Sequence, residues 1–320
     1  MIICLIAFCL FVTLASSPAT AQTYPSHAVR AIVAFAPGGV TDTFARLMAQ
    51  KLSENFGQQF YVDNIPGATG NIGTAQAAKA TPDGYTLLFA FSSYVVNPTL
   101  FDTIPYDPDR DLAPVTLAVT STTVLTVNPQ VPAATVTDLV ALIKANPGKY
   151  SYSTAGAGTQ AHLAGEQFRQ LLDLDLVHVP YSGGSPAILA VVGGHTPIGF
   201  SSPAASLPQI KQGNVRALAV TGDKRSQILP DVPTMAEAGY PEIVGESWVG
   251  VLVPAGTPKD IIGLLQREIA RIIAVPDMKA RLADLGYEPV ASTPEEFGAR
   301  IKSEIATWAK VIRAAHIKPE

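Results

Sequence analysis

The stretch FAPGGVTDTFAR, residues 35–46, joins an apolar run to an amphipathic segment through a Pro-Gly-Gly turn. The run AIVAF has the pattern of a buried strand, and apolar residues recur at helical spacing after the Thr-Asp pair. A strand, a glycine turn and an exposed helix start present unpaired backbone N–H groups, which attract anions. Yet no Lys, Arg or His lies between Arg30 and Arg46. The stretch predicts an α/β protein in which backbone N–H groups hold an anion without help from a cationic side chain.

The first residues have the pattern of a cleavable export signal. Residues 2–14 form an apolar core, and the small-x-small site at 19–21 predicts a signal peptide spanning residues 1–21. This core is too short to cross a bilayer as a permanent helix. No Lys or Arg lies near Met1, so the usual basic start is missing, and the alternative is a buried N-terminal strand of a cytoplasmic protein. We expect export to the periplasm.

Composition and charge narrow the class of protein further. The chain has 320 residues, of which 48% are hydrophobic and 15% charged, as in folded globular proteins. A formal net charge of −4 argues against nucleic acid and anionic membranes as partners. Both cysteines, Cys4 and Cys9, lie in the predicted signal peptide. The mature chain is therefore expected to have no disulfide, thiolate metal site or cysteine nucleophile.

The length of the mature chain favours two lobes. Removal of the signal leaves 320 − 21 = 299 residues, near the size at which one core divides into two. No Pro/Gly-rich linker is present, so the chain must change lobes within structured segments, near Val119–Val124 and Val244–Trp248. We therefore predict lobe I from residues 23–122 plus 246–320, and lobe II from residues 123–245.

Strand and helix patterns alternate along the chain, which predicts an α/β fold with mostly parallel sheets. Helices are expected over residues 41–56 and 136–146, and the Thr257-Pro258 and Thr293-Pro294 pairs each place a capping hydroxyl before a proline. Glu296 completes a capping box with Thr293, and that helix is expected to end near residue 315. The predicted strands are AVRAIVAF, TLLFAF, APVTLAV, KYSYST, LVHVPY, PIGFSS, VRALAVT and SWVGVLV.

Three strand-to-helix turns have the same chemistry. They are PGGVTD (37–42), STAGAGTQAH (153–162) and PYSGGSPA (180–187), all rich in Gly, Ser and Thr. Glycine lets the backbone approach a ligand closely, and the helix dipole adds about half a positive charge at the N-terminus. Four or five hydrogen bonds to a carboxylate, at roughly 1.5–3 kcal/mol each less ordering costs, support a dissociation constant on the order of micromolar. Neutral donors therefore suffice for a reversible carboxylate carrier.

Individual residues in these turns leave two interpretations open. Asp42 is either an ordinary first-turn carboxylate favoured by the helix dipole, or it accepts from a ligand ammonium or hydroxyl or orders a bridging water. His162 is either a histidine packed in its helix or a ligand contact. Ser182 and Ser185 could simply cap the helix that begins near Pro186.

Enzyme classes fit the sequence less well. Residues 156–161, GAGTQA, match the dinucleotide pattern G-x-G-x-x-A between a strand and a helix, so an NAD-dependent oxidoreductase is an alternative. However, Asp173 and Asp175 precede the next strand, whose far end lacks the expected acid. No G-x-S-x-G motif is present, and His162 with Glu166 lacks an evident third metal ligand. We expect a non-enzymatic binding protein with no cofactor and no metal.

Along most of its mature length the sequence resembles the substrate-binding proteins of tripartite tricarboxylate transporters, the TctC/Bug family. The resemblance rests on ordered blocks rather than on one motif. They include FAPGGVTDTFAR, YVDNIPGATGNIG, TPDGYTLLFA, STAGAGTQAHLAGE, VPYSGGSPA, LPDVPTMAEAGYP and SWVGVLVPAGTP. It implies a periplasmic clamp of the type II (Venus flytrap) class, whose two lobes close over a small carboxylate in the cleft. It also implies delivery to the membrane permease subunits of the transporter, and we expect the protein to act as a monomer.

The resemblance also implies which positions contact the ligand. From lobe I they are Phe35, Ala36, Pro37, Gly38, Gly39 and Asp42, with Ser92 and Tyr94 after the strand TLLFAF. From lobe II they are Ser153, Thr154, Ala155, Gly156, Gly158, Thr159, His162, Tyr181, Gly183 and Ser201.

Three departures from the family pattern bear on the ligand. Tyr94 stands about where the family often has His, Ser182 where Lys is common, and Ser201 where Asp often follows Phe. These departures favour a less charged pocket, hence a mono- or dicarboxylate, with aromatic acids among the candidates. An exported sensor protein that feeds a two-component system is the alternative among binding proteins.

Overall fold

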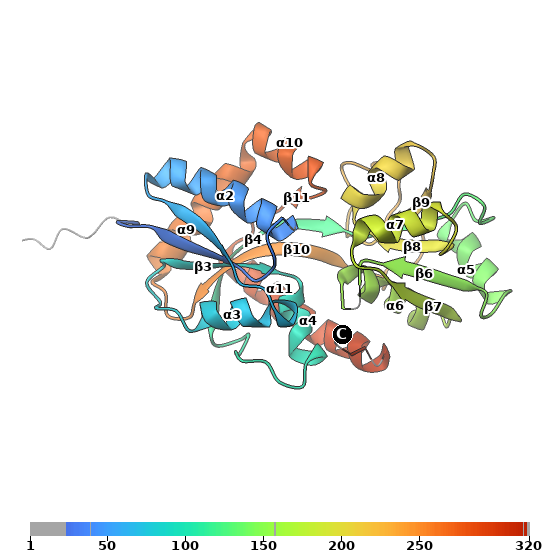
Figure 1. Cartoon of the computed structure of the whole chain (residues 1–320), viewed down its shortest axis with the longest axis horizontal. Coiled ribbons are helices and arrows are strands. Elements are labelled where there is room, and N and C mark those ends of the chain that lie inside the picture. The colour runs from blue at the N-terminus through green and yellow to red at the C-terminus, as the bar shows by residue number, and fades with distance from the viewer. Residues whose placement is uncertain (1–23, 39, 157, 316, 319–320) are drawn as a thin grey trace, which may run out of the picture.

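The computed structural model describes residues 24–38, 40–156, 158–315 and 317–318, which form two α/β lobes lying end to end (Figure 1). The predicted signal peptide and Gly39 lie outside the described residues. Each lobe is built around one sheet with helices on both faces. This is the predicted fold class.

The sheet of lobe I is mixed and has the strand order β11-β4-β10-β3-β1-β2. Strands β1, β2 and β3 are parallel, whereas β10 runs antiparallel to β3 and β4, and β11 antiparallel to β4. Its strands are β1 (Val29–Val33), β2 (Phe60–Asn64), β3 (Thr86–Phe91), β4 (Leu112–Thr122), β10 (Glu246–Pro254) and β11 (Glu288–Pro289).

Two hydrophobic clusters cover the faces of this sheet. One face packs against α2 (Val40–Phe56), α9 (Lys259–Ala274) and α10 (Pro276–Asp284), and it includes Phe44 and Met48 at the predicted helical spacing. The other face packs against α3 (Asn71–Ala78), α4 (Ser93–Leu100) and α11 (Pro294–Ala315), with a short helix η1 (Ala68–Gly70) before α3. Burial on both faces explains why the strands are almost continuously apolar.

The sheet of lobe II has the order β7-β6-β8-β5-β9. Here β6 is parallel to β7 and β8, and β5 is antiparallel to β8 and β9. Its strands are β5 (Val124–Val127), β6 (Tyr150–Thr154), β7 (Leu176–Pro180), β8 (Ile198–Ser201) and β9 (Arg216–Val220). Its helices are α5 (Val136–Lys144), α6 (Gln160–Leu171), α7 (Gly184–Val192) and α8 (Pro203–Lys211).

The chain passes between the sheets in two neighbouring segments. Strand β4 of lobe I ends at Thr122 and β5 of lobe II begins at Val124, while β10 returns the chain to lobe I at Glu246 (Figure 1). The two crossing segments are hydrogen-bonded to each other. The N–H of Thr221, just after β9, donates to Thr123 O at 2.9 Å, and the N–H of Thr123, between β4 and β5, donates to Thr221 Oγ1 at 3.0 Å. The lobe boundaries stated from the sequence stay a prediction.

Two expectations about local structure were wrong. The sheets are mixed rather than mostly parallel, because β4, β5 and β10 carry the chain across and back and so reverse direction within each sheet. Thr257 does not cap α9, since its hydroxyl donates to Pro254 O at 2.7 Å and the helix begins at Lys259.

The capping box before α11 is confirmed. The N–H of Thr293 donates to Glu296 Oε2 at 2.9 Å, and the N–H of Glu296 donates to Thr293 Oγ1 at 3.2 Å.

Within the part of the chain that the structure describes, no helix has the length and apolar character needed to cross a bilayer.

Candidate ligand site between the lobes

The β1–α2 turn is held in place by a buried carboxylate. Asp42, in the first turn of α2, is only 2% exposed. Its Oδ2 accepts from the N–H of Gly38 and from Nε of Arg46, both at 2.9 Å, and its Oδ1 accepts from Nδ2 of Asn64 at 2.8 Å. The same Asn64 amide donates to Phe35 O at 3.0 Å. Both sides of the turn are therefore fixed within lobe I.

These contacts decide the charge state of Asp42. Burial alone would raise its pKa, but the hydrogen bonds from Arg46, Gly38 and Asn64 outweigh burial and hold the pKa below the ordinary value. The carboxylate stays ionised, and Arg46, whose side chain is half exposed, offsets its charge. Of the two roles left open by the sequence, the contacts support that of a first-turn carboxylate, which here holds the β1–α2 turn through Gly38, Arg46 and Asn64. Gly38, at φ +83°, donates its N–H to Asp42 rather than leaving it for a ligand.

The β3–α4 turn contains one polar group that is buried without a partner. Ser92 is 1% exposed, and its Oγ has no hydrogen-bond partner among the described residues. The ring of the preceding Phe91 meets Phe35 edge-on, with centroids 5.8 Å apart, so the two predicted lobe I turns are in contact. Tyr94 points elsewhere: its hydroxyl donates to Pro108 O at 2.9 Å, and its ring stacks on Tyr106 in the core of lobe I.

The β6–α6 turn of lobe II forms a compact loop around Gly156. Thr159 Oγ1 donates to Gly156 O at 2.7 Å and accepts from the N–H of His162 at 3.3 Å, which makes Thr159 the N-cap of α6. Gly156 and Gly158 have φ values of +130° and +72°, which favour glycine. A helix leaves the N–H groups of its first turn without intrahelical acceptors. Thr159 caps the third, and the first two belong to Gln160 and Ala161.

His162, in the first turn of α6, accepts a hydrogen bond from this turn. The N–H of Gly158 donates to His162 Nδ1 at 3.0 Å, so Nδ1 carries no proton and the neutral ring is protonated at Nε2. The ring stacks on His178, with centroids 3.9 Å apart. Of the two roles that the sequence left open for His162, the contacts support packing. The N–H of Gly158 is used within the turn, so it is not free to bind a ligand.

Behind His162 lies a buried carboxylate, Glu166. It accepts from the hydroxyl of Tyr152 at 2.6 Å and pairs with Arg169 at 2.7 Å. Burial raises the pKa of Glu166, but the hydrogen bonds from Arg169 and Tyr152 outweigh it and leave the pKa below the ordinary value. Burial lowers the pKa of His162, and Glu166, 3.9 Å from its Nε2, only partly opposes this effect. The described residues include no group of three His, Cys, Asp or Glu that could hold a metal.

The lowered pKa of His162 predicts a pH-dependent stability. Between the folded pKa and the ordinary value of about 6.5, the unfolded chain binds a proton that the folded chain does not. The contribution of His162 is therefore complete above about pH 6.5 and is lost as the pH falls through that window. We expect the midpoint of thermal unfolding to fall less between about pH 7.5 and about pH 5.5 in His162→Asn than in wild type. His195→Asn, at an exposed histidine, is the control, and an unchanged pH slope in His162→Asn would contradict this account.

Four other predicted site residues lie within or just after the carboxyl ends of strands β6, β7 and β8 in lobe II. Ser153 Oγ donates to Ala187 O at 3.0 Å, and Ser201 Oγ lies 2.6 Å from Ser206 Oγ, so both hydroxyls have partners within the lobe. Tyr181 is half-buried and donates its N–H to Thr154 O at 3.0 Å. Gly183, at φ +150°, leads into α7.

A cavity of about 220 Å³ lies where the β6–α6 turn faces the crossing strands, and none of its described lining comes from the β1–α2 turn. The described residues that line it are all uncharged, and they come from both lobes. They are Phe91, Ser121, Thr122, Thr123, Ala155, Thr159, Gln160, Ala161, Gly184, Ser202, Ala204, Ser247, Leu285 and Tyr287. A lining that combines aromatic and polar side chains and a place between lobes are typical of a small-molecule site.

Only Ala155 and Thr159 of this lining were predicted from the sequence. Gln160 could have been found, since it follows the N-cap in a turn already identified as a ligand site. Ser121–Thr123 and Ser247 lie in the segments where a lobe change was expected. No local pattern points to Leu285 and Tyr287, because the end of α10 reaches the cavity only through the tertiary fold.

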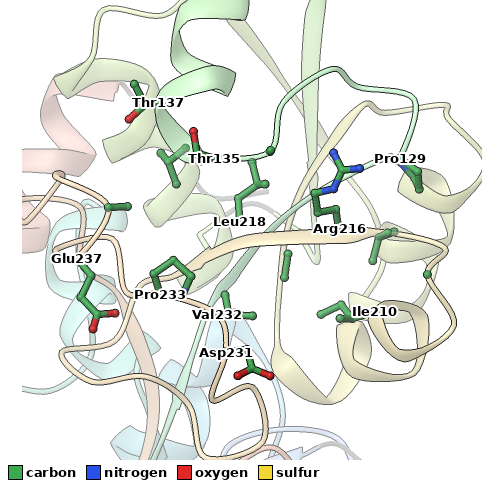
Figure 2. Close-up of a pocket in the computed structure, with 16 residues that line it drawn as sticks. Pro129, Thr135, Thr137, Ile210, Arg216, Leu218, Asp231, Val232, Pro233 and Glu237 are labelled. Atoms are coloured by element: carbon green, nitrogen blue, oxygen red, sulfur yellow. The ribbon is translucent and has the colours of Figure 1, made fainter.

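A larger groove, of about 800 Å³, lies on lobe II alone (Figure 2). It runs beside β9 and the start of α5, and it includes Arg216, Asp231 and Glu237. None of the predicted site residues that the structure describes lines it. Because it carries charges of both signs and involves one lobe, it is not the site that the strand-to-helix turns form.

Comparisons with known proteins agree with one another. A family model described as "Tripartite tricarboxylate transporter family receptor" matches residues 44–317. Protein BugT of Bordetella pertussis is 39% identical over 95% of this chain and 94% of its own length. The solved structure of R. palustris Rpa4515 with adipate is 34% identical, with a TM-score of 0.78 over 93% of this chain and 100% of the other. That of MatC from Rhodopseudomonas palustris with bound malate is 30% identical, with a TM-score of 0.74 over 90% and 100%.

Proposed function

This chain belongs to the tripartite tricarboxylate transporter receptor family, and from that premise we propose that it captures a small organic carboxylate between its lobes for uptake across the membrane. The observation that carries the proposal is the cavity between the lobes, whose described lining includes the first two residues of α6 and no charged side chain.

The start of α6 supplies the attraction for an anion. Gln160 and Ala161 occupy the helical positions whose N–H groups lack intrahelical acceptors, and both residues line the cavity. The helix dipole adds to their pull, so a carboxylate is favoured there without lysine or arginine. The negative charge of Asp42 does not repel the ligand carboxylate, because Arg46 offsets that charge within lobe I.

The ligand class follows from the size and lining of the cavity. The related structures are described with adipate and with malate, which are small dicarboxylates. In this chain Phe91 and Tyr287 add aromatic surface to the cavity. We propose a mono- or dicarboxylate, with aromatic acids among the candidates. The turn residues Phe35–Gly38, Thr154–Gly156 and Gly183 are proposed to form the mouth of the site.

The mechanism is binding that favours a closed form, without covalent chemistry. The two lobes touch on either side of the cavity: a Cβ on Gly158 would lie 3.2 Å from Leu100 Cδ2, and one on Gly286 would lie 3.0 Å from the backbone N of Ala204. A ligand that contacts both lobes binds the closed arrangement better and so shifts the population toward it. The closed, monomeric receptor would then deliver its ligand from the periplasm to a membrane permease.

Native mass spectrometry of the purified protein, followed by thermal unfolding with added acids, tests the proposal. We expect a small organic acid to co-purify or to raise the unfolding midpoint in a concentration-dependent way. Stabilisation by citrate-like tricarboxylates alone would overturn the proposed ligand class. Steady conversion of the acid into product would instead show an enzyme.

A further inference from the structure

The side chain of Thr154, the last residue of β6, shapes the turn that follows it. Thr154 is fully buried, and its Oγ1 accepts from the N–H of Gly156 at 3.3 Å. A hydrogen bond from a threonine hydroxyl to the N–H two residues further on forms a local turn that restrains the residue between them. That residue is Ala155, which lines the cavity between the lobes.

The proton of this hydroxyl is best placed for His178, on the neighbouring strand β7. Thr154 Oγ1 lies 2.7 Å from His178 Nε2, whereas the other acceptor within reach, Gly156 O, lies 3.4 Å away. Gly156 O already accepts from Thr159 Oγ1 at 2.7 Å. We therefore assign the hydroxyl of Thr154 as the donor and His178 Nε2 as the acceptor, which leaves the lone pairs of Oγ1 for the N–H of Gly156.

Neighbouring rings hold the imidazole of His178 in this position. In the parallel register of β6 and β7, His178 lies opposite Tyr152, and their ring centroids are 4.9 Å apart. From α6, the ring of His162 stacks on it at 3.9 Å. The same His162 accepts from the N–H of Gly158, further along the turn. The two stacked imidazoles therefore bond to the β6–α6 turn at its start, through Thr154, and near its end, at Gly158.

We propose that His178 is a positioning residue for ligand binding, which acts through the hydroxyl of Thr154 to hold Ala155 in the arrangement that receives the ligand. The inference rests on the proposed function, which places the ligand in the cavity that this turn lines. His178 does not line the cavity, so its effect passes through Thr154 rather than through contact with the ligand. A turn that is ordered before binding loses less conformational entropy when the ligand arrives, so breaking this bond should weaken binding.

The test breaks the bond from each of its two ends. Calorimetric titration with adipate, malate and benzoate first shows which acid the wild-type protein binds most tightly, and that acid is the probe. Thr154→Val removes the hydroxyl, and His178→Phe keeps a ring for the stack but removes Nε2. Each is expected to weaken the probe about tenfold. Because both remove the same hydrogen bond, the double variant should also weaken it about tenfold, rather than about 100-fold.

Conservative variants and a matched control separate positioning from a general loss of structure. Thr154→Ser keeps the hydroxyl and His178→Gln keeps a terminal polar group, so both should bind the probe within about threefold of wild type. Thr126 is also fully buried in lobe II, on β5, and its hydroxyl donates to Gly199 O at 3.2 Å. Neither Thr126 nor Gly199 lines the cavity. Thr126→Val should lower the midpoint of thermal unfolding and leave the affinity unchanged.

The outcomes separate this inference from the function on which it rests. Affinity close to wild type in Thr154→Val or His178→Phe, or effects that add in the double variant, overturns the role of His178 while carboxylate binding stands. An equal loss of affinity in Thr126→Val overturns it as well. Because the two single variants lie at opposite ends of the bond, either one decides the test if circular dichroism shows that the other is unfolded. Failure of the wild-type protein to bind any of the three acids overturns the proposed function itself.

Discussion

Replacing Gly158 with leucine is expected to lower ligand affinity about 10- to 100-fold while each lobe remains folded. Gly158 has φ +72°, where an L side chain adds roughly 1–2 kcal/mol of strain, and a Cβ there would lie 3.2 Å from Leu100 Cδ2 on α4 of lobe I. Closing the lobes onto the larger side chain adds an overpacking cost of roughly 1–3 kcal/mol. The backbone strain is the same with or without ligand, so only the overpacking cost opposes closure, and roughly 1.4–2.7 kcal/mol of it corresponds to 10- to 100-fold.

Gly213→Leu is the matched control for this experiment. Gly213 also has φ +72°, but nothing lies within 4 Å of its Cβ position. The control therefore carries the same backbone strain without the contact between lobes. Calorimetric affinity for a ligand found by thermal unfolding is the measurement, with circular dichroism as the check on folding. Equal affinities in the two variants would show that the Gly158–Leu100 contact plays no part in closure.

Asp42→Ala is expected to weaken binding about tenfold and to lower the free energy of unfolding by about 2 kcal/mol. The substitution removes the acceptor of three hydrogen bonds, from Gly38, Arg46 and Asn64, and frees the β1–α2 turn. Loss of the turn's geometry weakens its contribution to the site, and the unpaired groups reduce stability. Gly38 and Arg46 reach solvent, so water replaces part of what they lose.

Asp138→Ala separates this effect from loss of any first-turn carboxylate. Asp138 is the third residue of α5 and accepts from the N–H groups of Ala134 and Thr135 in a capping box away from the cavity. The Asp138→Ala substitution should lower the free energy of unfolding by about 1 kcal/mol and leave the affinity for the ligand unchanged. If Asp42→Ala also left affinity unchanged, the β1–α2 turn would have no part in the site.

Much of the fold could be predicted from local patterns. The strand before Pro-Gly-Gly, helix α2 and the capping box at Thr293 each depend on residues close together in the sequence. The mixed direction of the sheets could not be predicted in this way, because β10 pairs with β3 and β4 across more than a hundred residues. Strands β2 and β5 were missed, since short apolar runs beside polar residues give weak signals.

The candidate site, too, could be predicted only where it depends on residues close together in the sequence. The sequence singled out the β6–α6 turn, two of whose predicted residues line the cavity, but it did not show which backbone N–H groups bond to the protein's own side chains. Gly38 donates to Asp42 and Gly158 to His162, and each of these bonds depends on a side chain one helical turn further on. Asn64, on strand β2, completes the hydrogen bonds to Asp42. Such partners follow from the tertiary structure rather than from a local motif.

The central claim is that backbone dipoles between the lobes hold an organic anion without a cationic side chain. A crystal structure of the protein with adipate tests it most directly. The account predicts a carboxylate within hydrogen-bond distance of the N–H groups of Gln160 and Ala161, with no lysine or arginine touching it. Adipate seated in the lobe II groove of Figure 2, or held by a guanidinium such as that of Arg46, would contradict it.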